Sequence, residues 1–336
     1  MENNPLISVI VPVYQVKDYL AECLEPLAHQ VGVYSYEVIL VDDGSTDGSE
    51  KICDAYATQY PAIFKAMHQE NRGLSLARNA GISLARGLWL AFADADDIPH
   101  RDFVLGLVHC VMAHHECDAA SVGFSTMGKN DKLKTPAGRS GVSSGLFAAG
   151  LVLSDSVRAY VWNKCVSHAF LNKTGLRFYP FRSGFEDQPF SFAVFLSAKA
   201  VAFTKKSCYT YRAFREGSVS QTSGTERLYS HINSLFACRA YADRILGPQA
   251  GAAMFASRIN RFRLLLIPDL PSARKKPGED KGVAAKAWEA FKVLRLLGED
   301  NLQVYGAPWE REVLAYSGSL PGFVSYNPSG NGEDGQ

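Results

Sequence analysis

The chain has 336 residues, of which 47% are hydrophobic, and its 35 Lys and Arg nearly balance its 34 Asp and Glu. This balance excludes nucleic-acid binding through an overall positive charge, so any anion site must be local. No apolar run approaches the roughly 18–20 residues that cross a bilayer, and no basic-then-apolar leader is visible. Seven cysteines without repeated spacing are typical of reduced thiols. We expect a cytoplasmic globular protein.

Strand and helix signals alternate over the first 125 residues. Short apolar runs predict strands at 7–13, 36–41, 64–68, 88–93 and 118–124. Apolar residues at helical spacing predict helices near 19–27, 50–60, 74–86 and 101–115. The alternation predicts an α/β fold with a mainly parallel central sheet flanked by helices. Ligands of such sheets bind beyond the carboxyl ends of the strands.

The rest of the chain gives weaker signals. Gly, Ser, Thr, Asn, Pro and Lys dominate 126–142, which predicts a flexible connection or lid. A helix is predicted at 189–197 and a Tyr-rich strand at 207–212. Helical signal then runs from 225 to about 267 and over 283–298, and the polar tail is expected to be disordered. We therefore expect one domain at 1–222 with halves at about 5–125 and 143–222, a helical extension at 225–326, and a tail at 327–336.

Acidic residues follow two of the predicted strands. Asp42 and Asp43 come after 36–41, and Asp94, Asp96 and Asp97 come after 88–93. Carboxylates crowded at a buried strand end repel one another, and a shared divalent cation relieves that cost because hard cations prefer oxygen ligands. An acidic turn that caps a helix would explain one aspartate but not three. The pattern predicts metal and phosphate chemistry at this edge.

A second cluster of metal-ligating residue types lies further on: His109, Cys110, His114, His115 and Cys117. Cys110 and His114 are one helical turn apart, which suits two ligands on one face. No second pair with zinc-ligand spacing accompanies them. We interpret the cluster as polar residues at the exposed end of a helix.

Several motifs occur in a characteristic order. They are Ile10-Val11-Pro12-Val13-Tyr14, the run from Val41 to Ser49, the run from Asn71 to Gly81, and Asp94-Ala95-Asp96-Asp97. Trp162-Asn163-Lys164, Glu186-Asp187, and Tyr211-Arg212 with Arg215 and Ser218 follow. In this order and spacing the chain resembles glycosyltransferase family 2, whose nucleotide-sugar domain has the GT-A fold. The likeness covers roughly residues 5–220 and is strongest to bacterial members that build exopolysaccharide, lipopolysaccharide or capsule.

The resemblance implies a nucleotide-sugar site, for a UDP-sugar, made of Pro12, Val13, Tyr14, Asp43, Arg78, Asp94, Ala95 and Asp96. Tyr14 would stack on the base, unless it is a core aromatic. Asp43 would accept a hydrogen bond from the uracil N–H, or serve only as a hydrogen-bonded loop carboxylate. Arg78 would contact the diphosphate or pair with an aspartate to hold the acidic loop.

The acidic loop would carry the cofactor of the resembled family, Mg²⁺ or Mn²⁺. Asp96 and Asp97 are its expected ligands, and Asp94 would shape the turn or reach the sugar. Such an ion offsets the charge that builds on the departing diphosphate.

Catalysis would also need a base, and Asp187 matches its position in the resembled family. It would take the proton of the attacking hydroxyl, and Glu186 would support it or contact the acceptor. A charge at the start of a helix is the competing interpretation.

Two further groups of residues are also candidates for the site. Trp162, Asn163 and Lys164 would rim the acceptor pocket, although a buried tryptophan is the ordinary alternative. Arg212 and Arg215 would close over the diphosphate, or form a solvated basic turn.

The resemblance thus implies an inverting, metal-dependent glycosyltransferase that moves a sugar onto a saccharide or lipid-linked saccharide acceptor in surface polysaccharide synthesis. Residues 255–267, with Arg274-Lys275-Lys276, combine arginines with bulky apolar residues and would contact the inner face of the cell membrane, or pack as an ordinary helix. One alternative is a sugar-1-phosphate nucleotidyltransferase, which would carry a Gly-rich basic loop where this chain has Val13 to Asp18. The other is a nucleotide-sugar-binding protein without catalysis.

Overall fold

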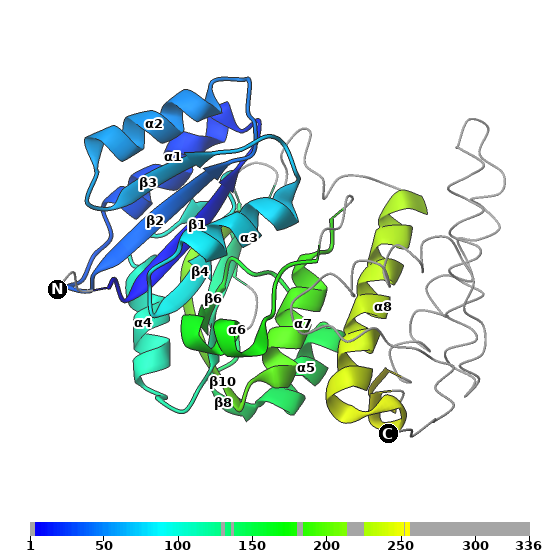
Figure 1. Cartoon of the computed structure of the whole chain (residues 1–336). Coiled ribbons are helices and arrows are strands. Elements are labelled where there is room, and N and C mark those ends of the chain that lie inside the picture. The colour runs from blue at the N-terminus through cyan, green and yellow to red at the C-terminus, as the bar shows by residue number, and fades with distance from the viewer. Residues whose placement is uncertain are drawn as a thin grey trace, which may run out of the picture.

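A central sheet with helices on both faces organises the protein (Figure 1). The computed structural model describes residues 4–128, 132–135, 138–179, 184–213, 225–251 and 253–255. The described strands are β1 (Ile7–Val13), β2 (Tyr36–Asp42), β3 (Phe64–His68), β4 (Trp89–Phe92), β5 (Ile98–Pro99), β6 (Ala119–Met127), β7 (Leu133–Lys134), β8 (Gly141–Ser144), β9 (Lys164–Ser167) and β10 (Ala200–Arg212). The described helices are α1 (Lys17–Ala28), α2 (Ser49–Gln59), α3 (Leu74–Leu84), α4 (Phe103–Met112), α5 (Gly145–Leu153), α6 (His168–Thr174), α7 (Asp187–Ser197) and α8 (Thr225–Leu246).

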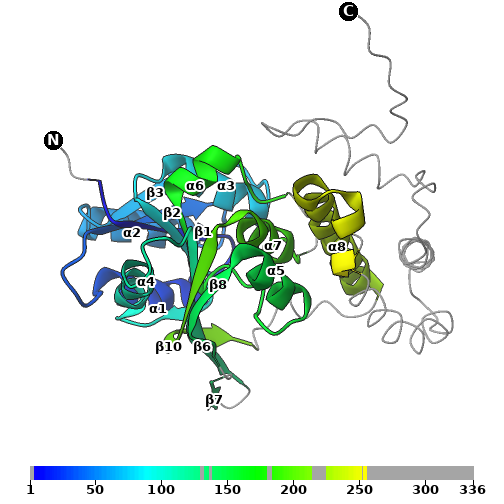
Figure 2. The same ribbon diagram turned by 90° about the horizontal axis from the view of Figure 1, so that it is seen from below.

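The first half of the sheet is parallel, as the sequence predicts. Its order is β3-β2-β1-β4, with β1 paired to both β2 and β4. Every residue of β1 is buried, because helices cover both faces. Val9 and Val11 pack with residues of α1 and α4, whereas Ile10 packs with residues of α3 on the other face. Figure 2 shows α1 and α4 on one side of the sheet and α5 and α7 on the other.

The second half of the sheet is mixed, which departs from the expected mainly parallel order. Strand β9 lies between β4 and β6 and runs antiparallel to both, and β10 is parallel to β6. The segment predicted as a flexible connection contains β7 and β8 in its described part, and β8 pairs with β10. These short strands lack a clear local pattern, because pairing with distant strands is what makes them strands.

Strand β10 is longer than the predicted 207–212 and carries side chains to the edge where β1, β2 and β4 end. Its residues Tyr209 and Thr210 pair with the two-residue strand β5. Because β5 directly follows the loop Asp94–Asp97, this pairing brings the acidic loop against the end of β10. Predicted helices correspond to α1, α2, α3, α4 and α7, with boundaries that differ by at most three residues.

Helix α8, the last of the helices given above, packs on α7 (Figures 1 and 2). Its residues Leu235, Cys238 and Ala242 are buried in the same hydrophobic cluster as Phe192. The predicted linker at 268–282, the helix at 283–298 and the tail lie outside the described residues. Among the described helices, none is both long enough and apolar enough to cross a membrane.

Helix α3 approaches the sheet closely at Gly81. A Cβ at that position would lie 2.3 Å from Cγ2 of Ile10 on β1. We expect Gly81→Ala to lower the free energy of unfolding by about 1–3 kcal/mol, because the helix must move away from the strand. Urea unfolding followed by tryptophan fluorescence measures this.

Gly150→Ala is the matched control, since Gly150 also lies inside a helix but a Cβ there meets no atom within 4 Å. This substitution should raise the free energy of unfolding by about 0.5–1 kcal/mol. Equal effects of the two substitutions would contradict the close helix–strand contact.

Candidate functional site

The guanidinium of Arg78 binds three carboxylates at the carboxyl edge of the sheet. Its Nη2 donates to Oδ1 of Asp94 at 2.7 Å, and its Nη1 donates to Glu186 and Asp187 at 2.8 Å each. Asp94 follows β4, whereas Glu186 and Asp187 begin α7, so one side chain of α3 joins three segments. The predicted site residues Arg78, Asp94, Glu186 and Asp187 are therefore neighbours. The sequence left open whether Arg78 pairs with an aspartate or contacts the diphosphate. The structure shows the pairing with aspartate, and contact with a diphosphate stays a prediction.

Burial and charge give this cluster unusual protonation behaviour. Arg78 is 1% exposed; burial would lower its pKa, but the charges of Asp187, Asp94 and Glu186 raise it above the ordinary value. Burial raises the pKa of Asp187 to about 7, and the charges of Glu186 and Asp94 add to this rise while Arg78 opposes it. One cation faces three carboxylates, so a carboxyl group of the cluster binds a proton near neutral pH.

Asp43 holds the loop that leads into α3. Its Oδ1 accepts from Nε2 of Gln69 and from the backbone N–H of Arg72, and its Oδ2 accepts from the backbone N–H of Gly73 at 2.7 Å. The side chain is almost fully buried. Asp43 is thus a hydrogen-bonded loop carboxylate, which is one of the two roles considered from the sequence. A hydrogen bond to a uracil N–H stays a prediction and would use a remaining lone pair.

The turn after β1 is joined to the turn after β2. The backbone N–H of Gln15 donates to Oγ of Ser45, and the Gln15 side chain exchanges hydrogen bonds with Thr46. Gln15 has a φ of 51°, which turns the chain sharply after Tyr14. The Tyr14 side chain is 49% exposed, so it is not a core aromatic. Pro12 and Val13 lie within β1 and are paired to β2.

Asp42, the other half of the first acidic pair, has a structural role. Its Oδ1 accepts from the backbone N–H of Ser45, and its Oδ2 is 2.9 Å from Nδ1 of His68. The hydrogen bond to Asp42 raises the pKa of His68, and burial opposes this. Asp42 therefore shapes the turn that carries Asp43.

The loop Asp94–Asp97 is attached to β10 through Asp97. Oδ2 of Asp97 accepts from the hydroxyl of Tyr209 at 3.1 Å, and Oδ1 accepts from the backbone N–H of Arg212 at 2.8 Å. The hydroxyl of Tyr209 in turn accepts from the backbone N–H of Asp94. Burial, with the charges of Asp94 and Asp96, raises the pKa of Asp97 well above its usual range. The sequence marked a Tyr-rich strand here but did not identify Tyr209 as a site residue.

Asp97 faces β10, and its predicted role as a metal ligand stays a prediction. Both of its oxygens already accept hydrogen bonds, and the side chain is 2% exposed. Asp96 is partly exposed, and Ala95, which precedes it, is buried. In the part of the chain that the structure describes, no group of three His, Cys, Asp or Glu side chains is arranged to hold a metal ion. Mg²⁺, however, commonly takes only one or two carboxylates together with phosphate oxygens, so Asp96 fits such an ion better than Asp97.

Trp162 lies in a stack of aromatic rings inside the protein. Its ring is 1% exposed and is stacked on Tyr209 at 4.6 Å and on Tyr160 at 4.7 Å between ring centroids. Asn163 donates to Oγ of Ser121 and to the carbonyl of Val122. Both side chains thus have structural partners, as the core interpretation expects for the tryptophan. Their contact with an acceptor stays a prediction.

Lys164 is buried and ties down the segment before β9. Its ammonium donates to the carbonyls of Arg158 and Tyr160 and to Oδ1 of Asn163. Burial lowers the pKa of Lys164 to about 7, and the charge of Asp187 opposes this. The backbone N–H of Val161, next in this segment, donates to Oδ2 of Asp187 at 3.3 Å. Lys164 therefore anchors the segment whose Val161 N–H donates to Asp187.

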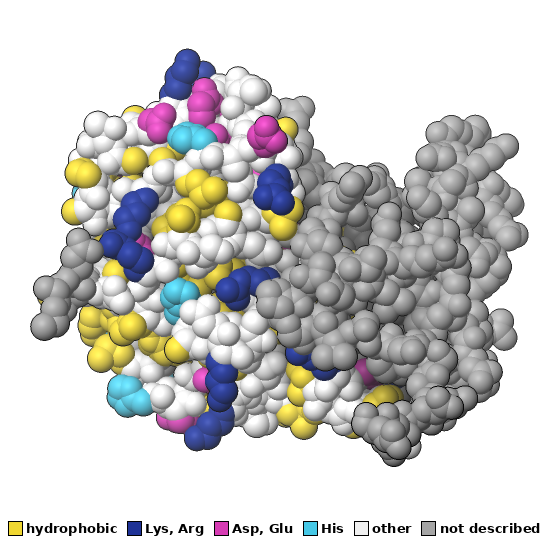
Figure 3. Space-filling view, in the orientation of Figure 1, with side chains coloured by type: hydrophobic (Ala, Val, Ile, Leu, Met, Phe, Trp, Pro, Cys, Tyr) yellow, Lys and Arg dark blue, Asp and Glu magenta, His cyan; other side chains and the backbone are white. Residues whose placement is uncertain are grey.

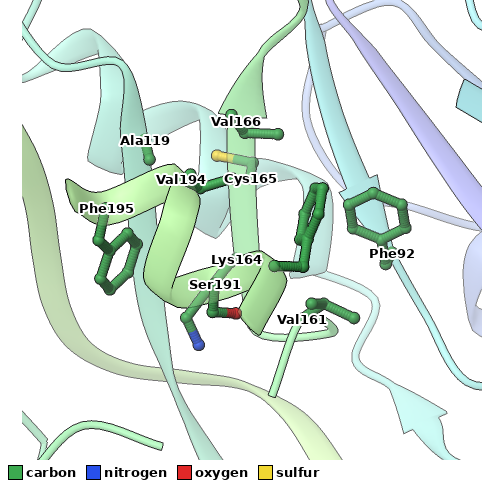
Figure 4. Close-up of a pocket in the computed structure, with 10 residues that line it drawn as sticks. Phe92, Ala119, Val161, Lys164, Cys165, Val166, Ser191, Val194 and Phe195 are labelled. Atoms are coloured by element: carbon green, nitrogen blue, oxygen red, sulfur yellow. The ribbon is translucent and has the colours of Figure 1, made fainter. Parts of the chain in front are cut away.

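A small cavity lies beside Lys164, between β9 and α7 (Figure 4). Its volume is about 10 Å³, which is room for roughly one water molecule. Its lining is mostly hydrophobic: Phe92, Ala119, Val161, Lys164, Cys165, Val166, Phe190, Ser191, Val194 and Phe195. This cavity is far too small for a nucleotide sugar, so it is not the predicted donor site.

The remaining predictions concern the surface charge, the possible zinc cluster, and the arginines at and after the end of β10. On the described part of the face in Figure 3, Lys and Arg side chains are scattered rather than gathered into one basic patch. Cys110 and Cys117 of the possible zinc cluster are both buried. Arg212 donates from Nε to the carbonyl of Asp96, and its guanidinium also pairs with Glu22. Arg215 lies outside the described residues.

Comparison with known proteins shows what the chain is similar to. Residues 8–167 match the family model described as glycosyl transferase family 2. EpsH of Bacillus subtilis, which is named as a glycosyltransferase, is 33% identical over 216 residues. That alignment covers 62% of this chain and 61% of EpsH, so the chain spans less than two thirds of that relative. Residues 8–167 of the chain are therefore similar to glycosyltransferase family 2.

Solved structures agree with the fold. The crystal structure of S. aureus TarS 1–349 in complex with UDP-GlcNAc has a TM-score of 0.68, with 18% identity over 87% of this chain and 81% of that one. Mannosyltransferase PcManGT from Pyrobaculum calidifontis, in complex with GDP-Man and Mn²⁺, has a TM-score of 0.52, with 17% identity over 95% of this chain and 81% of that one. At these identities the likeness establishes the GT-A fold.

Arg78 should be the residue on which this site depends for stability. We expect Arg78→Met to lower the free energy of unfolding at pH 7.5 by about 3–5 kcal/mol, because three carboxylates lose their buried cation. The loss should be smaller at pH 5, where these carboxylates can bind protons. Urea unfolding at both pH values measures the difference.

Arg86→Met is the matched control. Arg86 pairs with the buried Glu37, but the arginine side chain is 48% exposed and Lys65 also pairs with that carboxylate. Its loss should cost about 0–1 kcal/mol. A pH-independent loss for Arg78→Met would contradict the charge-based explanation.

Proposed function

We propose that this protein is an inverting glycosyltransferase that moves a sugar from a nucleotide-diphosphate sugar, preferentially a UDP-sugar, to a saccharide or lipid-linked saccharide. The match of residues 8–167 to glycosyl transferase family 2 supports transfer from a nucleotide sugar. The TarS and PcManGT structures contain UDP-GlcNAc and GDP-Man respectively, so both bases are represented among structures of this fold. The chain's acidic loop, exposed tyrosine and buried arginine cluster support a donor site at the carboxyl edge of the sheet.

The proposal rests on the partial exposure and the raised pKa of Asp187. This carboxylate is 17% exposed, so one part of it faces outward while Arg78 and the backbone N–H of Val161 hold its oxygens. Its pKa of about 7 suits a general base that works near neutral pH. Glu186 contacts the same guanidinium but is only 8% exposed. We therefore assign proton abstraction from the acceptor hydroxyl to Asp187 and support of Arg78 to Glu186.

Transfer then follows from these positions. The acceptor hydroxyl attacks the anomeric carbon from the side of Asp187 and loses its proton to that carboxylate. The new glycosidic bond forms as the bond to the diphosphate breaks, so the configuration inverts. Asp94, held by Arg78, would contact the donor sugar, and Arg212, held against Asp96, would contact the diphosphate.

A divalent ion is the proposed cofactor. Asp96 would hold Mg²⁺ or Mn²⁺, which would offset the negative charge on the leaving group. Asp97 would orient this loop through Tyr209 and the backbone of Arg212, which its hydrogen bonds support. The Mn²⁺ in the PcManGT structure is consistent with this proposal but belongs to that protein.

Few of the described residues bear on the acceptor or on contact with a membrane. The predicted membrane-contacting segment lies outside the described residues except at Phe255. Phe255 is 2% exposed and its ring contacts Phe192, as expected of an ordinary packed helix. A nucleotide-sugar-binding protein without catalysis would not need the raised pKa of Asp187. The nucleotidyltransferase alternative would need a basic phosphate loop after β1, where Tyr14 and Gln15 lie.

Asp187→Asn should lower kcat for release of UDP from a UDP-sugar by about 10²–10⁴-fold, because the base is lost. UDP binding, measured by calorimetry with Mn²⁺, should change less than about twofold. The assay uses the full chain, Mn²⁺ and a panel of UDP-glucose, UDP-galactose and UDP-N-acetylglucosamine, with and without saccharide acceptors. Glu186→Gln is the matched control: it removes a charge from the same guanidinium and should cost less than about tenfold in kcat.

The pH dependence of kcat gives a second test of Asp187 as the base. Asp187 must be ionised to accept a proton, so kcat should rise with pH through about 7 and then level off. A profile that is flat from pH 5.5 to 8.5 would contradict the assigned base. Equal losses of kcat in Asp187→Asn and Glu186→Gln would do the same.

Tyr14 is proposed to stack on the base of the donor. Tyr14→Ala should weaken UDP binding by about 0.5–1.5 kcal/mol, a rise in Kd of roughly 2- to 12-fold, while Tyr14→Phe should keep the affinity. The melting temperature without ligand should not change, because the side chain is half exposed. Thermal shift with UDP, GDP and Mn²⁺ measures all of these. Unchanged affinity in Tyr14→Ala would remove the stacking role.

A further inference from the structure

Helix α8 contacts the first turn of α7 on both sides of the two carboxylates that Arg78 binds. On one side, the ring of His231 is stacked on the ring of Phe185, with centroids 4.6 Å apart and planes within 8°. On the other side, Oγ of Ser234 donates to Oε1 of Gln188 at 2.9 Å. Glu186 and Asp187 lie between these two attachment points.

The backbone at Phe185 needs such support. Its φ is 65°, in the left-handed region that residues with a side chain rarely occupy. That conformation costs roughly 1 kcal/mol or more for a non-glycine residue, so the surroundings must hold it. It directs the chain into α7 so that Glu186 and Asp187 face Arg78. The stacked His231 is the described neighbour placed to hold this ring.

The contact at Gln188 is buried and specific. Ser234 is 0% exposed and Gln188 is 4% exposed. A buried hydrogen bond of this kind fixes two helices in register, because an acceptor that loses its donor is left without water. Residues Leu235, Cys238 and Ala242 then bury the rest of this face of α8 in the main core.

We infer that His231 and Ser234 are positioning residues for the base Asp187, so that α8 is part of the catalytic unit although it lies beyond residues 8–167. The inference rests on the proposed function, since it assigns α8 to the same site. His231 acts through Phe185 and Ser234 acts through Gln188. Neither is assigned a contact with the substrates.

The test compares His231→Ala with His231→Phe in the full chain. His231→Ala should lower kcat for UDP release by at least about tenfold and leave the Kd for UDP within twofold, because the donor side is untouched. His231→Phe keeps a flat ring against Phe185 and should restore kcat to within threefold of the wild type. In His231→Ala the midpoint of the pH profile should move to higher pH, since Arg78 lowers the pKa of Asp187 and a looser contact lowers it less.

Ser234→Ala should behave as His231→Ala does. Ile245→Ala on the same helix is the control and should keep wild-type kcat, because Ile245 is 40% exposed and far along α8 from these contacts. Unchanged kcat and pH midpoint in both His231→Ala and Ser234→Ala would overturn the inference. Equal losses of kcat in His231→Ala and His231→Phe would also overturn the role of the ring.

Hydrogen exchange separates this inference from the proposed function. Amides of residues 184–196 should exchange faster in His231→Ala, with recovery in His231→Phe and no change over residues 36–48. If the wild type releases UDP but exchange and kcat are unaltered by the variants, the inference fails and the proposed function stands. If the wild type releases no nucleotide from any donor, the proposed function fails, and exchange over 184–196 alone decides whether α8 holds α7.

Discussion

The structure of the site depends on one buried guanidinium. Arg78 extends from α3 and binds Asp94 after β4 together with Glu186 and Asp187 at the start of α7. Three carboxylates could not gather in a nearly dry environment without this cation, because their mutual repulsion and lost hydration would be too costly. Burial, with the charges of Glu186 and Asp94, raises the pKa of Asp187 to about 7, and Arg78 opposes this rise. The contacts that stabilise the cluster are therefore also those that set the pKa of the proposed base.

The loops around this cluster are held by hydrogen bonds rather than by regular structure. Asp43 fixes the approach to α3, Ser45 and Thr46 fix the turn that presents Tyr14, and Tyr209 fixes the acidic loop. Asp43, Ser45 and Thr46 lie in the turn after β2, and Tyr209 lies on β10. A site built this way keeps its reactive groups in place before any ligand arrives, which reduces the reorganisation that binding and catalysis require.

The cluster around Arg78 extends beyond the segment that matches the family model. Residues 8–167 include Asp94 and Arg78, whereas Glu186 and Asp187 come later in the chain. The start of α7 contacts Arg78 on one side and α8 on the other. With Asp187 as the proposed base, substitutions in α8 would alter its position without touching Asp94 or Arg78.

The sequence alone determined the alternating strands and helices of the first 125 residues, because their hydrophobic periodicity is a local property. It also located Asp43 and Asp94–Asp97 at strand ends, since a parallel sheet gathers such ends at one edge. The roles of Arg78 and Asp187 followed from resemblance and not from periodicity.

Only the tertiary structure decided that β9 enters the sheet antiparallel, that Trp162 is stacked inside, that Asp97 turns toward Tyr209, and that the ring of His231 is stacked on Phe185. Each of these depends on contacts between residues distant in sequence. Local pattern carries no signal for such contacts, because a side chain's direction is set by whichever partner the whole fold brings to it.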